Sequence, residues 1–117
     1  TKADPDVYVL GDSSAQGDMP NSGFSANSQA KVCAAAIVAA LAGESLPAPS
    51  YANTCYSLVG PDYGISVSAV YRLEAGAITA VAGAGGVSPS GVGPEFRARE
   101  ARYTRGWYAS ITTDSFG

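Results

Sequence analysis

The stretch from about Ser25 to Leu41 constrains the fold most strongly, because nearly all of its residues are apolar or small. Most of them are strong helix formers, with Ser25 or Asn27 available as the N-cap and Gly43 placed to stop the helix. Its apolar side chains would surround the helix instead of forming one stripe. We therefore expect a buried helix, with Cys33 as an ordinary core residue.

A chain of this size and composition has few residues with which to bury such a helix. A domain of 117 residues buries only about two-thirds of the surface that its unfolded chain exposes. Apolar residues make up 46% and charged residues 15%, which is too lightly charged for a small domain with a well-solvated surface of its own. The chain also begins at Thr1 without a methionine. We expect a piece of a longer protein whose other parts supply the missing neighbours.

Charge and residue types exclude several classes of function. A net charge of −3 and a pI near 4.6 argue against nucleic acid as a partner, because phosphate binding needs clustered Lys and Arg. The chain has no histidine and two cysteines, so neither a His-based triad nor a typical zinc site is expected, and we predict no metal. The longest apolar run, Val32 to Ala42, falls short of the roughly 20 residues that cross a bilayer, so we expect no membrane span.

The amino-terminal part predicts one strand and a loop before the helix. Val7 to Leu10 is a run of four β-favouring or apolar residues that Gly11-Asp12 ends, which is typical of a strand buried on both faces of a parallel sheet. Asp12 to Asn21 is rich in Ser, Gly, Asp and Pro and should be a loop. Pro47 and Pro49 follow the helix, so we place a domain boundary near Pro49.

The rest of the chain predicts an antiparallel meander of three strands, at Tyr51 to Val59, Ile65 to Leu73 and Ala77 to Ala82. The second strand alternates, and its more apolar face holds Ile65, Val67, Ala69 and Tyr71. Turns are expected at Gly60-Pro61-Asp62 and Glu74-Ala75-Gly76, and a long loop from Gly83 to Gly93. The fold class is therefore α+β, divided into residues 1–49 and residues 50–117.

A last helix should begin at Pro94 and Glu95, with proline in the first turn and an acid near the positive end of the helix dipole. An apolar stripe on one face should dock it onto the sheet: Phe96, Tyr103, Trp107 and Ile111. Four arginines lie mostly on other faces, where they would be solvated: Arg97, Arg99, Arg102 and Arg105.

The strand that ends in Gly11-Asp12 is the first sign of a cofactor. Flavoproteins with two dinucleotide-binding domains use such an arrangement near their second FAD contact, because an acid at the end of a parallel strand can accept hydrogen bonds from ribityl hydroxyls and glycine allows close approach of backbone. The same two residues could simply begin the following loop, with Asp12 as its cap.

Three longer strings decide between these readings, namely Met19 to Lys31, Ser50-Tyr51-Ala52-Asn53-Thr54-Cys55-Tyr56-Ser57, and Tyr63-Gly64-Ile65-Ser66-Val67. With the terminal Gly106-Trp107-Tyr108 and Phe116-Gly117, the chain closely resembles the carboxy-terminal part of the flavoprotein subunit of flavocytochrome c sulfide dehydrogenase. The resemblance implies that residues 1–49 end an α/β FAD-binding domain and that residues 50–117 form a flavin-binding or interface domain.

The resemblance also implies a flavin site. Asp12, after Gly11, would bind the ribityl part of FAD, and the amino end of the helix near Ser25 would point free N–H groups at the flavin. Asn21 stands where this family often has a lysine. The residues expected beside the isoalloxazine ring are Met19, Pro20, Ser22 and Gly23.

By the same resemblance, Cys55 would be catalytic. It would form a redox-active disulfide with a cysteine from an earlier part of the flavoprotein, which sulfide would attack, and electrons would pass through the flavin to a haem on a cytochrome c subunit. The partner cysteine and the Gly-rich FAD fingerprint are not in this chain. The resemblance also implies a periplasmic location. The arginines of the last helix could dock the cytochrome subunit instead of facing solvent.

Other interpretations stay open beside this one. The chain could be a non-catalytic interface domain, or part of a related sulfide:quinone reductase or pyridine nucleotide-disulfide reductase. A disulfide between Cys33 and Cys55 is not expected, because it would consume the thiol that the mechanism needs.

Overall fold

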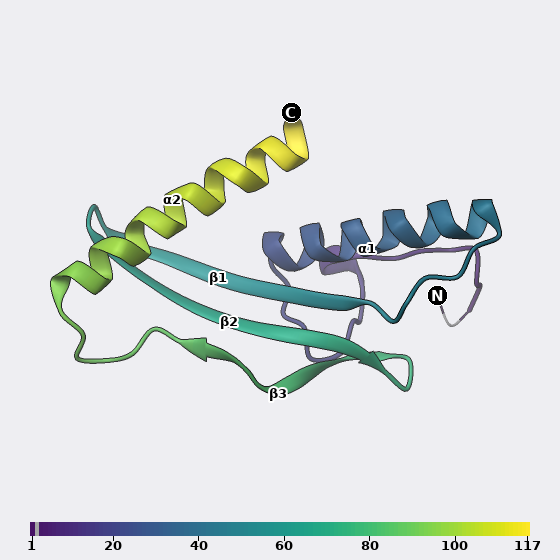
Figure 1. Ribbon diagram of the computed structural model, residues 1–117, viewed down its shortest axis with the longest axis horizontal. Coiled ribbons are helices and arrows are strands. Elements are labelled where there is room, and N and C mark those ends of the chain that lie inside the picture. Colours follow the sequence, from purple (N-terminus) through teal and green to yellow (C-terminus); the bar gives the residue numbers. More distant parts are fainter. Residues whose placement is uncertain (2) are drawn as a thin grey trace.

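The computed structural model describes residues 1 and 3–117 as an α+β fold with one helix before a three-stranded antiparallel sheet and one after it (Figure 1). This confirms the fold class. Along the chain the elements are a 3-10 turn η1 (Gly11–Ser13), helix α1 (Gly23–Ala42), strands β1 (Ser50–Gly60), β2 (Tyr63–Glu74) and β3 (Ala77–Val87), and helix α2 (Pro94–Phe116).

The sheet is the predicted meander, with strand order β1-β2-β3 and both predicted turns in place. Cys55 is opposite Val67 across the first pair of strands. The third strand is longer than predicted, since residues 83–87 belong to β3 and not to a loop. Gly85 is opposite Ala69 next to an irregularity in the register, and a Cβ at Gly85 would collide with the backbone of Ser68. The glycines that suggested a loop therefore permit a close, irregular strand pairing.

Helix α1 starts earlier than predicted. Ser22 is its N-cap, with its hydroxyl accepting the Ser25 N–H, and Gly43 ends it in the left-handed conformation at φ 70°, as expected. The prediction that the helix is buried is wrong within this chain, because Val38 is 66% exposed and Leu41 85% exposed. One side of α1 packs on β1 and the 11–22 loop, and α2 contacts its amino-terminal half at residues that include Phe24 and Lys31, so the rest of its surface stays largely exposed.

Helix α1 is also long and apolar enough to cross a membrane by length and composition. Core helices of soluble proteins pass the same comparison, and the packed side of α1 is polar, with Ser25 and Gln29 buried. The expectation that the chain does not span a membrane stays a prediction.

The segment Val7 to Leu10 is extended but pairs with no strand among the described residues, so the predicted buried strand does not form here. Val7, Tyr8 and Val9 are exposed. A parallel strand is stable only between partners that satisfy its backbone groups and cover both faces, and this chain provides neither.

Helix α2 docks only in part by the predicted aromatic stripe, since Phe96, Trp107 and Ile111 are half-buried but the most buried positions lie beside the stripe. Its buried residues are Arg97 and Ala101, while Tyr103 is 55% exposed. Gly64 of β2 allows this contact, because a Cβ there would lie 2.5 Å from the Ala101 nitrogen. Arg97, 7% exposed, lies over the Tyr63 ring and donates to the Pro89 carbonyl, so it is not one of a solvated set.

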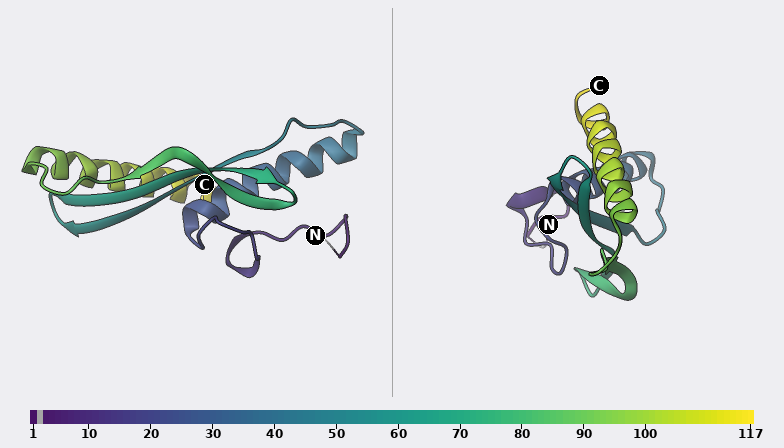
Figure 2. Two further views of the ribbon diagram at one scale, coloured as in Figure 1. Left: turned by 90° about the horizontal axis from the view of Figure 1, so that it is seen from below. Right: turned by 90° about the vertical axis from the view of Figure 1, so that its left-hand side faces the viewer.

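Trp107 joins the two helices to the sheet. Its ring stacks on Phe24 of α1 at a centroid distance of 6.1 Å and lies 5.5 Å from the Tyr56 ring of β1. Nearby, the Lys31 ammonium is 2.5 Å from an Asp114 carboxylate oxygen, and this hydrogen bond lowers the pKa of Asp114. Seen from below, α2 lies along the end of the sheet that carries the β1–β2 turn, and α1 extends toward the other end (Figure 2).

The chain has no large apolar core among the residues described. Its buried apolar side chains are Met19, Ala39, Tyr71 and Ala101. The radius of gyration is 16.4 Å, against about 13 Å for a compact domain of this length. The structure is therefore elongated, and much of its apolar surface is open.

A hydrogen-bond cluster around Glu100 fastens α2 to the strands. Its carboxylate accepts from the Ser88 hydroxyl at 2.6 Å and from the Ser66 hydroxyl at 2.8 Å, and Ser88 also accepts the Ser66 N–H at 2.7 Å. The Ser88 hydrogen bond lowers the pKa of Glu100, with further lowering from Ser66, Arg97 and Arg99.

We predict that Gly64→Ala destabilises the protein by about 1–3 kcal/mol, because the new methyl group would meet the backbone of α2 and not a movable side chain. Urea denaturation followed by circular dichroism measures the loss. Gly106→Ala on the open side of the same helix is the matched control, and it should stabilise by about 0.5–1 kcal/mol. Equal stability of the two variants would contradict the close contact.

We also predict that Glu100→Gln lowers the free energy of unfolding at neutral pH by about 1–2 kcal/mol. Since folding lowers the pKa of Glu100, the stabilisation is full above its ordinary value of 4.5 and is lost as the pH falls through the lower folded value. The difference between variant and parent should therefore shrink in acid. Glu44→Gln, at an exposed site, is the control and should leave the free energy of unfolding at neutral pH nearly unchanged.

Candidate functional site

The loop from η1 to α1, residues 11–22, is fixed against the sheet at its middle. Gly17 forms a parallel bridge with Ile78 of β3, and the Asp18 N–H donates to the Ile78 carbonyl at 2.9 Å. The Asp18 carboxylate in turn accepts the Ala80 N–H at 3.0 Å. Gly17 has φ 90° and no room for a side chain against Ile78, so this contact requires glycine.

Gln29 of α1 holds the two ends of the loop together. Its side-chain oxygen accepts the Gly11 N–H at 2.7 Å, and its amide nitrogen is 3.5 Å from the Met19 sulfur. Gln29 is buried, and Met19 is 2% exposed. The buried backbone N–H of Gly11 thus has the partner that burial demands.

Asn53 of β1 joins the N-cap of α1 to Cys55. Its side-chain oxygen accepts the Ser22 hydroxyl at 2.6 Å and the Ser25 hydroxyl at 3.1 Å. Its amide nitrogen donates to the Cys55 sulfur at 3.2 Å. Asn53 is 3% exposed, so the loop, the helix and the cysteine meet at a buried amide.

The predicted site residues separate into three groups by exposure. Gly11, Met19 and Ser25 are buried, while Ser22 and Cys55 are half-buried. Asp12, Pro20 and Gly23 are exposed. The structure brings Ser22, Ser25 and Cys55 together through Asn53, and it brings Gly11 and Met19 together through Gln29.

Cys55 lies on the sheet at the boundary between buried residues and solvent-exposed residues. Tyr71 of β2, on the covered side, is buried. Val67, directly opposite Cys55, and Ile65 beyond it are exposed. Both cysteines are free thiols, so the sulfur of Cys55 is available beside an open apolar surface.

Two tyrosines near the cysteines have raised pKa values. Burial raises the pKa of Tyr71 above its ordinary value of 10.0, and negative charge on Cys55 or Asp18 would raise it further. Burial likewise raises the pKa of Tyr51, with Cys33 contributing. Both phenols are therefore neutral at physiological pH.

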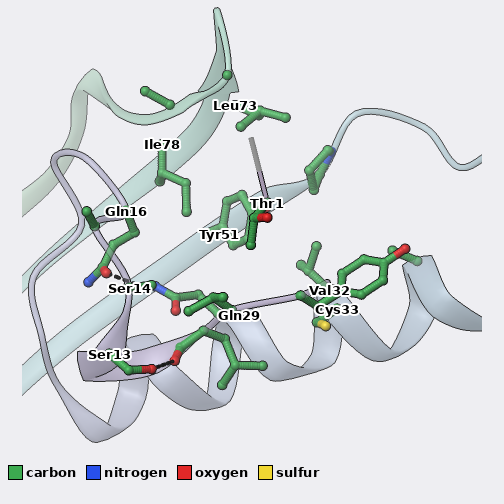
Figure 3. Close-up of a pocket in the computed structure, with 18 residues that line it drawn as sticks. Thr1, Ser13, Ser14, Gln16, Gln29, Val32, Cys33, Tyr51, Leu73 and Ile78 are labelled. Carbon is green, nitrogen blue, oxygen red and sulfur yellow. Dashed lines mark hydrogen bonds between the residues drawn. The ribbon is translucent and has the colours of Figure 1, made fainter. Parts of the chain in front are cut away.

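A cleft of about 800 Å³ lies elsewhere, between the amino-terminal segment, α1 and the turn between β2 and β3 (Figure 3). Tyr8, Val32, Tyr51 and Ile78 give it apolar walls, and among residues 1 and 3–117 no carboxylate, lysine or arginine side chain lines it. Cys33 faces it half-buried, so the prediction that Cys33 is a core residue is wrong for this chain. Asp12 and Cys55 lie outside the cleft, and we do not place the reactive site there.

Sequence reasoning missed Asn53 and Gln29. A signal for Asn53 was present, because residues two apart on a strand share a face and Asn53 precedes Cys55 by two. Gln29 was detectable only as a polar residue in an otherwise apolar helix. The hydrogen-bond partners of these two amides come from the 11–22 loop, and the sequence does not show where that loop lies.

One comparison with known proteins bears on this arrangement. A family model described as flavocytochrome c sulphide dehydrogenase, flavin-binding, matches residues 47–116. The match includes all three strands, all of α2, and both Asn53 and Cys55. The 11–22 loop and α1 precede it.

We predict that Gln29→Ala loosens the loop, because it leaves the buried Gly11 N–H without an acceptor at a cost of about 1–3 kcal/mol. Amide hydrogen exchange at Gly11 should become about 10- to 100-fold faster. Lys31→Ala, which removes an exposed ion pair from the same helix, should leave that rate unchanged. An unchanged Gly11 rate in Gln29→Ala would refute this role.

Proposed function

The chain belongs to the flavocytochrome c sulphide dehydrogenase flavin-binding family, and from this premise we propose that it is part of an FAD-dependent sulfide dehydrogenase. The enzyme oxidises sulfide through a redox disulfide and a flavin and passes the electrons to a cytochrome c subunit. The observation that carries the proposal for this chain is the free thiol of Cys55, inside the matched region and joined through Asn53 to the N-cap of α1.

The residues of the chain fit one side of an FAD site. Asp12 and Gly23 are exposed, and an added Cβ at Gly23 would meet no atom within 4 Å. The Gly23 and Phe24 N–H groups have no hydrogen-bond acceptor among the described residues, and a helix N-terminus of this kind favours negative charge. Asp12 would hold ribityl hydroxyls, and Pro20, Ser22 and Gly23 would face the ring.

Met19 and Ser25 would hold the residues of this site in place without being exposed to the flavin. Both side chains are buried in the chain, Met19 against Gln29 and Ser25 against Asn53. They fix the loop and the first turn of α1, and Gly11 is held in the same way through Gln29. The flavin, when bound, accepts an electron pair and releases electrons singly.

Cys55 would exchange sulfur with the substrate. In its disulfide with a cysteine from elsewhere in the flavoprotein, attack by hydrosulfide breaks the protein S–S bond and forms one persulfide S–S bond. The other protein sulfur leaves as a thiolate, so bonds and electrons balance without an outside oxidant at this step. The Asn53 amide N–H, with its nitrogen 3.2 Å from the Cys55 sulfur, donates to that sulfur and is placed to stabilise a negative charge on it.

The open surfaces support further protein partners. Residues 1–49 would complete an FAD-binding domain, in which the unpaired segment Val7 to Leu10 joins a parallel sheet and the exposed sides of α1 are covered. The amino-terminal part of the same flavoprotein is the proposed partner for these surfaces. The cytochrome c subunit is the proposed electron acceptor, and the periplasm the proposed location.

The test is the visible spectrum of the intact flavoprotein when sulfide is added. Cys55→Ser should slow flavin bleaching by sulfide at least about 10³-fold, because the disulfide that sulfide attacks can no longer form. Cys33→Ser is the matched control and should bleach at the parental rate, since Cys33 faces the separate cleft. Bleaching at the parental rate in Cys55→Ser would rule out this function for Cys55.

A further inference from the structure

The side chain of Asn53 is oriented by the groups on its oxygen side. Two hydroxyls, from Ser22 and Ser25, donate to that oxygen at 2.6 and 3.1 Å. Ser22 is held as well, because its hydroxyl caps α1 by accepting the Ser25 N–H at 3.0 Å. Since an amide oxygen has two lone pairs, both are used, and the amide nitrogen is left to face the Cys55 sulfur.

The other groups near Cys55 would disfavour negative charge on its sulfur. Tyr71 lies four residues along β2 from Val67, which is opposite Cys55, and negative charge on Cys55 or on Asp18 of the loop would raise the pKa of Tyr71. A tyrosine or an aspartate can add only negative charge. From β1 itself, the Asn53 N–H is the hydrogen-bond donor to the sulfur among the described residues, and no lysine or arginine forms a contact there.

We infer that Asn53 is a positioning residue that holds the Cys55 sulfur at the amino end of α1 and favours its thiolate form over its thiol form. A neutral donor at 3.2 Å from sulfur bonds more strongly to the charged form than to the neutral form. Because the donor is anchored through Ser22 and Ser25, the thiolate and the first turn of α1 keep a fixed separation. This inference rests on the proposed function, which assigns sulfur chemistry to Cys55.

The test is the pH profile of alkylation at Cys55 in the intact, reduced flavoprotein. Iodoacetamide reacts with the thiolate, and mass spectrometry of the peptides follows Cys55 and Cys33 separately in one sample. Asn53→Asp keeps the shape and both hydroxyl contacts but can replace the donor with a negative oxygen. It should move the midpoint of the Cys55 profile upward by about one to two pH units, a 10- to 100-fold loss of thiolate at a fixed acidic pH.

A second variant guards against misfolding of the first. Asn53→Ala removes the donor without adding charge, and it should move the midpoint upward by about half to one pH unit. The Cys33 profile is the internal control and should stay unchanged in both variants, because Cys33 lies along the cleft, which neither Asn53 nor Cys55 lines. An unmoved Cys55 midpoint in a folded variant overturns the inference, and so does an equal shift at Cys33, which would indicate general loosening.

The outcomes separate this inference from the proposed function. If sulfide still bleaches the flavin in Cys55→Ser while the Asn53 variants shift the alkylation profile, the proposed function fails and the positioning role stands. If Cys55→Ser blocks bleaching while the profile does not move, the function stands and the positioning role is overturned.

Discussion

The buried amide of Asn53 is the interaction on which the arrangement of the remaining parts depends. It joins the first turn of α1 to β1, and through the Ser22 cap it also fixes where the 11–22 loop enters the helix. In most small domains an apolar core would do this. Here the contact between helix and sheet is largely polar, and an amide whose donors and acceptors are matched permits one orientation where apolar side chains would allow several.

The shortage of apolar burial explains the shape of the molecule. Each helix packs on the sheet by one narrow face, and the most buried part of the α2 contact holds Gly64 of β2 and the arginine Arg97, with Trp107 as its large aromatic side chain. The two helices meet at Trp107. An elongated chain with exposed apolar faces on α1 and on the sheet beside Cys55 is suited to packing against further protein, as membership in a flavocytochrome family implies.

The predictions for strands and turns were more accurate than those for burial. Alternation along β2 and the turns at residues 60–62 and 74–76 are local properties, and they gave the meander correctly. The glycines of residues 83–87 were assigned to a loop, because composition cannot distinguish a flexible glycine from one that allows close strand pairing. The docking face of α2 was misjudged in part for a related reason, since Gly64 on another element determines it.

The amino-acid sequence by itself determined the fold class, the start of α2 at Pro94, the stop of α1 at Gly43, and the cysteine on which the proposed chemistry depends, because these follow from local pattern and family resemblance. Only the tertiary structure decided that Gln29 and Asn53 organise the site and that Cys33 faces a separate cleft. Hydrogen bonds between residues 18 to 31 positions apart depend on how the loop folds back, and no local pattern encodes that path.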